Sequence, residues 1–189
     1  MLRSQKNVRH SMLSSVRNLT VAAMLVAMSV VIGTFCKTFL DFGGLLRITF
    51  ENLPILLSGL LFGPVVGGLV GGATDLVSYL FSPQPYPLNL VVTVGATLIG
   101  VISGLVSHYV IRKPSILQIV LSCGTAHLVG SMIVKSIGLY QIFGWGVLIR
   151  IPMYVVIATI EIFVICLLFR RSRFWRMMGG ACEQGKEDA

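Results

Sequence analysis

Long apolar stretches, separated by short breaks rich in polar residues, glycine or proline, occupy most of the chain. The first covers Leu19–Phe35 and the last covers Val147–Phe169. About 20 apolar residues are enough for a helix to cross a bilayer. The pattern therefore predicts an all-α integral membrane protein, a bundle of six transmembrane helices joined by short connections. The expected helices are Leu19–Phe35, Ile48–Phe62, Pro64–Phe81, Leu88–Ile111, Ile116–Tyr140 and Val147–Phe169.

Composition supports the bilayer as the solvent. Hydrophobic residues make up 55% of the chain and charged residues only 12%, with a mean hydropathy of +0.88. A soluble domain averages about 25% charged residues. We expect one membrane-embedded domain over residues 19–170, preceded by a basic segment (1–18) and followed by a tail (171–189), with no separate soluble catalytic domain.

The net charge of +8 is unevenly distributed. Eleven of the fifteen Lys and Arg residues fall in the N-terminal segment, at Arg112-Lys113, or at the C-terminal end. Basic residues beside membrane helices favour the cytoplasmic side, so this distribution predicts that both termini are cytoplasmic. Such placement also favours contact with anionic lipids over nucleic acid.

The four remaining cations, Lys37, Arg47, Lys135 and Arg150, are all expected in or near the outer half of the bundle. Asp75, inside the third helix, lies about 16 Å along from Pro64 and therefore also in the outer half. An ionisable residue in a membrane helix is costly, so Asp75 is a candidate functional residue. Two interpretations stay open: Asp75 pairs with Lys135 or Arg150 to hold the bundle together, or it recognises a ligand.

The residue types at this end fit recognition of a flat, anionic molecule. A carboxylate can accept two hydrogen bonds side by side from an amidine-like edge of a heterocycle. Aromatic side chains offer faces for such a ring, and the cations would bind a ligand carboxylate. The candidate binding residues are Asp75, Tyr79, Tyr86, Asn89, Arg47, Lys135, Trp145 and Arg150, with Lys37 able to close over the ligand.

Other polar residues have structural interpretations. Thr49, Glu51 and Asn52 are expected to cap the second helix. His127 is expected to be a hydrogen-bonded structural histidine, and Glu161 is a packing partner with no assigned role. Glycines at four-residue spacing in the third helix, such as Gly67 and Gly71, predict close helix packing.

Enzyme classes are not favoured. The sequence holds no phosphate-binding loop, no metal-ligand spacing and no paired catalytic carboxylates. A rhomboid-like protease would need Gly-x-Ser-Gly, but Val101-Ile102 precedes Ser103-Gly104. We expect no enzyme activity and no cofactor, and any ATP-driven role would need its motor on other chains.

Several segments resemble one membrane protein family, the substrate-binding S components of energy-coupling factor (ECF) vitamin transporters, folate branch. The likeness covers nearly the whole chain. It rests on Arg47-Ile-Thr-Phe, on Leu61-Phe-Gly-Pro-Val-Val-Gly-Gly and on Asp75. Tyr86-Pro-Leu-Asn89, Gly138-Leu-Tyr140 and Arg150-Ile-Pro152 also fit.

The resemblance implies a multi-pass protein of a prokaryotic plasma membrane that binds folate near its outer face. It implies partners: a membrane-embedded coupling subunit and two cytoplasmic ATPases, whose ATP use makes the S component topple and release its ligand inside. An Ala-xxx-Ala pair docks on the coupling subunit in that family, and Ala23 and Ala27 match it. Another vitamin or pterin-like anion as ligand, or an autonomous small secondary transporter, stays open.

Overall fold

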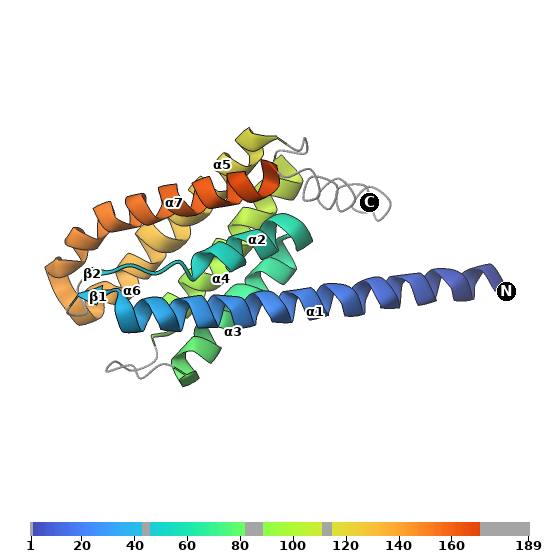
Figure 1. Ribbon diagram of the computed structural model, residues 1–189, viewed down its shortest axis with the longest axis horizontal. Helices are drawn as coiled ribbons and strands as arrows, with labels where there is room; N and C mark the ends of the chain where they lie inside the picture. Colours follow the sequence, from blue (N-terminus) through green and yellow to red (C-terminus); the bar gives the residue numbers. More distant parts are fainter. Residues whose placement is uncertain (1, 43–45, 82–88, 111–114, 171–189) are drawn as a thin grey trace.

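A bundle of helices, seen in a computed structural model, accounts for residues 2–42, 46–81, 89–110 and 115–170, the part of the chain that the structure describes (Figure 1). A two-residue antiparallel pair, in which Asp41 lies opposite Arg47, joins the first two helices. The fold class predicted from the sequence is confirmed as helical. The elements are α1 Leu2–Phe39, β1 Asp41–Phe42, β2 Leu46–Arg47, α2 Asn52–Phe62, α3 Pro64–Phe81, α4 Leu90–Leu105, η1 Val106–Val110, α5 Ile116–Ala126, η2 His127–Lys135, α6 Ser136–Phe143, η3 Gly144–Ile149 and α7 Arg150–Arg170.

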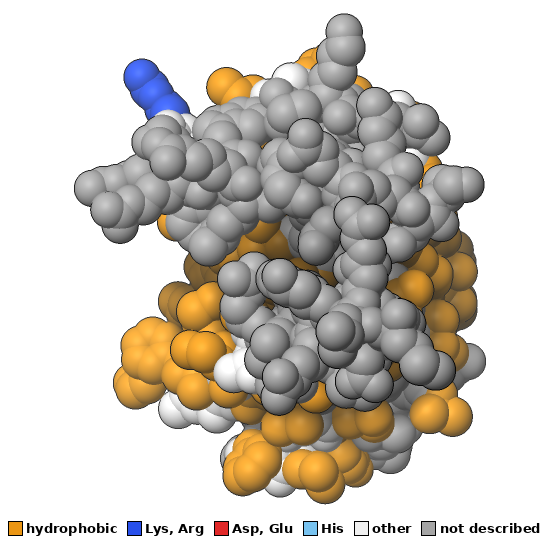
Figure 2. Space-filling model, turned by 90° about the vertical axis from the view of Figure 1, so that its right-hand side faces the viewer, with side chains coloured by type: hydrophobic (Ala, Val, Ile, Leu, Met, Phe, Trp, Pro, Cys, Tyr) orange, Lys and Arg blue, Asp and Glu red, His pale blue; other side chains and the backbone are white. Residues whose placement is uncertain are grey.

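Five helical segments of the described chain are long and apolar enough to cross a membrane. The expected second span is shorter: α2 has 11 residues, about 16 Å of helix, against a hydrocarbon core of about 30 Å. Exposed apolar side chains cover the flanks of the bundle, as the end view in Figure 2 shows. The helical bundle with apolar flanks is therefore observed, whereas a count of six spans stays a prediction.

The short helix α2 forms the centre of the core. Eight of its eleven residues are buried, including Ile55, Leu56 and Leu60. They pack with Ile99 of α4 and with residues of α5 and α7 in one hydrophobic cluster. A helix that is apolar on all sides is stable only when other elements surround it.

Glycines bring α3 and α4 into backbone contact. A Cβ on Gly67 would lie 2.5 Å from the carbonyl oxygen of Gly100, and one on Gly71 would collide with the carbonyl oxygen of Ala96. The close packing predicted from the glycine spacing is confirmed. A tight turn at Gly63 separates α2 from α3, with φ of 86°, a value that glycine adopts without steric cost.

Several helix boundaries differ from the expectation. The first helix includes the basic segment from Leu2 and continues to Phe39, so Lys37 belongs to its last turn and not to a loop. The last helix begins at Arg150 after a 3-10 turn, because Gly144 with φ of 55° breaks the chain direction before it. The predicted fifth helix is continuous, but its middle, His127–Lys135, is a π-helix.

The direction of the helices defines two ends of the bundle. At one end α1 and α3 finish and α2, α4 and α7 begin, beside β1 and β2; we call this the hairpin end (Figure 1). At the opposite end α1 begins and α7 ends, so both are on one side of the bundle. Which side of the membrane that is stays a prediction, and the tail 171–189 lies outside the described residues.

Candidate functional site

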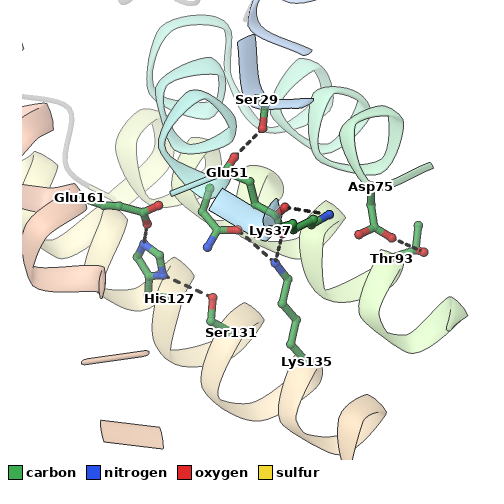
Figure 3. A network of polar contacts seen from close by, with 10 residues as sticks. Ser29, Lys37, Glu51, Asp75, Thr93, His127, Ser131, Lys135 and Glu161 are labelled. Carbon is green, nitrogen blue, oxygen red and sulfur yellow. Dashed lines mark hydrogen bonds and ion pairs between the residues drawn. The ribbon is translucent and has the colours of Figure 1, made fainter. Parts of the chain in front are cut away.

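Charged side chains meet at the hairpin end around Glu51, which directly precedes α2. Lys37 Nζ of α1 lies 3.4 Å from Glu51 Oε2, and Lys135 Nζ of η2 lies 3.9 Å from Glu51 Oε1 (Figure 3). Lys135 also donates a hydrogen bond of 3.0 Å to Oδ1 of Asn52. All three charged side chains are at most 15% exposed. Charges this far from water need partners, and here they supply one another.

The sequence-based role of Glu51 as a helix cap was wrong. Glu51 occupies the N-cap position of α2 but makes no side-chain capping hydrogen bond. Its backbone is already helical, with φ of −63° and ψ of −21°, whereas a capping side chain usually requires an extended backbone. The carboxylate is directed to the two lysines instead. An acidic residue beside apolar helices that contain unexplained lysines was the signal that could have shown this.

Lys135 reaches the cluster because α4 offers it a bare backbone. A Cβ on Gly95 would lie 2.7 Å from Lys135 Cγ and 3.1 Å from the carbonyl oxygen of Gly130. The apolar stem of the lysine therefore lies along Gly95 while its ammonium group contacts Asn52 and Glu51. Long cationic side chains commonly bury their methylene groups in this way.

Asp75 is half-buried on α3 and accepts a 2.6 Å hydrogen bond from Thr93 Oγ1 of α4 (Figure 3). The suggested structural pairing of Asp75 with Lys135 is not seen among the described contacts, since Lys135 binds Asn52 and Glu51 instead. The alternative pairing with Arg150 stays a prediction. Thr93 as the partner was not foreseen, because a threonine in an apolar helix gives no distinctive signal.

The helix α4 lies between Asp75 and Lys135. Thr93 and Gly95 are two residues apart, so they point about 200° apart around the helix. α3 packs on one face of α4, at Ala96 and Thr97, and η2 packs on the face that holds Gly95. Asp75 and Lys135 thus both lie towards the hairpin end but on opposite sides of α4.

Asn89 has both polar side-chain atoms engaged at the start of α4. Its Oδ1 accepts a hydrogen bond from the backbone N–H of Val91 at 3.0 Å, which caps the helix. Its Nδ2 donates to the carbonyl oxygen of Gly138 at 2.7 Å, which fixes α4 to α6. Its predicted contact with a ligand stays a prediction, and the observed contacts are structural.

The remaining predicted residues have varied surroundings. Arg150 is buried and begins α7, Tyr79 is 39% exposed on α3, and Trp145 is 76% exposed. The Trp145 ring meets that of Tyr140 edge to face, with centroids 6.1 Å apart. The side chain of Arg47 and the whole of Tyr86 lie outside the described residues.

A second polar pair is buried between η2 and α7. His127 Nε2 lies 2.7 Å from Glu161 Oε2, and both side chains are at most 4% exposed (Figure 3). His127 Nδ1 lies 3.3 Å from Ser131 Oγ. The expectation of a hydrogen-bonded structural histidine is confirmed, and Glu161 is its partner, which the sequence did not indicate.

The two alanines at the predicted docking position are exposed. Ala23 and Ala27 lie on the outward face of α1, while Ala22, Leu25 and Ser29 are buried against the bundle. Nothing in this chain's described residues therefore covers the alanine pair. Among those residues, no group of three or more His, Cys, Asp or Glu side chains is placed to hold a metal ion.

Comparisons with known proteins agree with this architecture. A solved structure, "Crystal structure of FolT bound with folic acid", matches with a TM-score of 0.62 and 22% identity over 77% of this chain and 88% of that chain, which shows a shared fold. The folate transporter FolT of Clostridium novyi (strain NT) is 27% identical over 106 residues, 54% of this chain and 58% of that protein. The uncharacterized protein MG098 homolog of Mycoplasma pneumoniae is 32% identical over 105 residues, 51% of this chain and 21% of that protein.

This chain thus matches less than two thirds of the length of either curated relative. The protein family described as "ECF transporter, substrate-specific component" covers much more of it, residues 17–182. The chain therefore belongs to the family of substrate-specific components of ECF transporters.

Proposed function

We propose that this chain binds folate at the hairpin end and delivers it across the membrane as the S component of an ECF importer. The similarity to the folate transporter FolT and the fold shared with folic acid-bound FolT support folate as the ligand. A different vitamin or a pterin-like anion is the alternative ligand within the same family.

The observation that carries this proposal is the cluster of Lys37, Lys135 and Glu51. Two ammonium groups share one carboxylate there, 3.4 and 3.9 Å away. An anionic ligand group would balance the remaining positive charge in surroundings where charge interactions are stronger than in water. The glutamate part of folate provides carboxylates that fit this need.

Asp75 is the residue proposed to bind the pterin end. Thr93 fixes its orientation by donating to Oδ2, and a carboxylate oxygen has lone pairs for more than one donor. The amino group and the adjacent ring N–H of a pterin are two donors side by side, which a carboxylate can accept together. Because α4 begins at Leu90, only three residues before Thr93, an elongated ligand lying across the start of α4 would reach both groups of residues.

The exposed alanines of α1 are proposed to dock on a membrane-embedded coupling subunit. Small residues at Ala23 and Ala27 allow another helix to approach closely, which is a common means of association in membranes. Two cytoplasmic ATPases would hydrolyse ATP, so this chain itself would not be an enzyme. Toppling of the S component in a prokaryotic plasma membrane would then release folate inside.

Titration of the purified chain with folate, measured by isothermal calorimetry in detergent, tests the ligand. Binding at micromolar folate or below supports the proposal, and its absence rejects folate. Mass spectrometry of small molecules that co-purify would then identify another vitamin. Affinity purification from native membranes tests the partners: recovery of neither a coupling subunit nor ATPases would favour an autonomous transporter.

A further inference from the structure

We propose that Glu51 limits how strongly this site prefers anionic ligands. Its carboxylate would do so by partly neutralising the two lysines that a ligand carboxylate would bind. The inference rests on the proposed function, because it concerns the anion-binding part of the same site. It gives an electrostatic role to a residue that the sequence indicates only as a helix cap.

The first observation is that α1 holds Glu51 in place along three successive turns. Ser29 Oγ donates to the backbone carbonyl of Glu51, and Lys37 pairs with its carboxylate. Between them, a Cβ on Gly33 would lie 2.8 Å from Glu51 Oε2. Residues four apart lie on one face of a helix, so the bare backbone at Gly33 leaves room for the glutamate side chain.

The second observation is the quality of the charged contacts. Hydrogen bonds between ammonium and carboxylate groups are normally about 2.7–2.9 Å long. The contacts of Glu51 with Lys37 and Lys135 are 3.4 and 3.9 Å. Lys135 makes its shorter contact, 3.0 Å, with the neutral oxygen of Asn52. Glu51 therefore acts on Lys135 mainly through its charge, and a ligand carboxylate can share the same lysine.

The charges of these three side chains sum to +1, since two lysines face one glutamate. Removing the negative charge leaves +2 and should strengthen binding of an anion, while removing Lys37 leaves zero and should weaken it. Removing the charges of both Glu51 and Lys37 restores the sum of +1. This order depends on charge alone, whereas a purely structural role of Glu51 predicts that every change at Glu51 weakens binding.

The experiment compares folate with folate dimethyl ester, whose two glutamate carboxylates are masked, by calorimetry on the purified full chain. The readout is the ratio of the Kd of the ester to the Kd of folate. In Glu51→Gln we expect this ratio to rise about tenfold, the size expected for one unit charge acting over several ångströms in a protein. In Lys37→Gln the ratio should fall by a similar factor, and in the double variant it should return to that of the wild type.

Glu51→Asp is the matched control, because it keeps the charge and should keep the ratio. If Glu51→Gln does not fold, as judged by gel filtration, the fall in Lys37→Gln and the constancy in Glu51→Asp still test the inference. An unchanged or lower ratio in a folded Glu51→Gln protein, or no fall in Lys37→Gln, overturns it. Failure of the wild-type chain to bind folate rejects the proposed function, and this inference with it, whereas wild-type binding with equal ratios in all variants rejects the inference alone.

Discussion

Asp75 of α3 and Thr93 of α4 are joined by a hydrogen bond of 2.6 Å on the face of α4 opposite to Lys135. The bond connects two helices that are already in backbone contact through glycines. It fixes the orientation of the carboxylate, and an oriented carboxylate near the start of α4 is suited to receive paired donors from a ligand.

Replacing Asp75 by asparagine should weaken folate binding while the protein still folds. The amide accepts through only one oxygen and has no charge, so a loss of about 1.5–3 kcal/mol is expected, or roughly 10- to 100-fold in Kd. Calorimetry measures the affinity, and the melting temperature without ligand checks the fold. Thr93→Val, which removes only the orienting donor, should have a smaller effect. Unchanged affinity in Asp75→Asn would leave Asp75 with a structural role.

Substitution of Gly95 by alanine should disturb the binding site through Lys135. The added Cβ would lie 2.7 Å from Lys135 Cγ, so the lysine must move away from Asn52 and Glu51. Such overpacking costs about 1–3 kcal/mol. Because about 1.4 kcal/mol corresponds to a tenfold change in Kd, we expect calorimetry to show a loss of folate affinity of about tenfold.

Gly124→Ala is the matched control for this change. Gly124 also lies in a helix, but a Cβ there would meet nothing within 4 Å. Alanine is favoured over glycine in helices by up to about 1 kcal/mol, so this variant should bind folate normally and melt at the same or a higher temperature. Equal folate affinity in the two variants would contradict the placement of Lys135 over Gly95.

The sequence was sufficient for the parts of the fold that depend on local pattern. Apolar length predicted the helices, and glycine spacing predicted the contact between α3 and α4. It did not predict that η2 is a π-helix or that α2 has only 11 residues. Where apolar residues continue past a helix boundary, hydrophobicity says little about where the helix begins.

The candidate site was predicted as a set of residues but not as a set of contacts. The cations and Asp75 do lie at one end of the bundle, yet α4 separates Asp75 from Lys135. Which carboxylate a lysine meets depends on helix rotation, and charge patterns do not specify rotation. Glu51 was therefore interpreted as a cap and Glu161 was left without a role, although each has a cationic or imidazole partner.

The buried pair of His127 and Glu161 should contribute to stability as a unit. Their side-chain atoms are 2.7 Å apart with almost no exposure, so removing one partner leaves a buried polar group without its bond. His127→Leu and Glu161→Leu should each lower stability by about 2–5 kcal/mol. The double variant should be less destabilised than the sum of the two, because neither His127 nor Glu161 is then left buried without the other. Thermal unfolding of all four proteins measures this coupling, and strictly additive effects would contradict it.

Replacing Ala23 by tryptophan should prevent assembly with the coupling subunit and leave folate binding intact. Ala23 is exposed on the outward face of α1, far along the helix from Lys37, so a large ring there would separate the two helices without reaching the charged cluster. Close packing through small residues does not tolerate such a ring.

Thr159→Trp, at another exposed position on α7, is the control and should assemble normally. Co-purification with the partner subunits and calorimetry with folate provide the two readouts. Normal recovery of the complex with Ala23→Trp would show that docking uses another surface, and loss of folate binding in that variant would show that the ring disturbs the bundle itself.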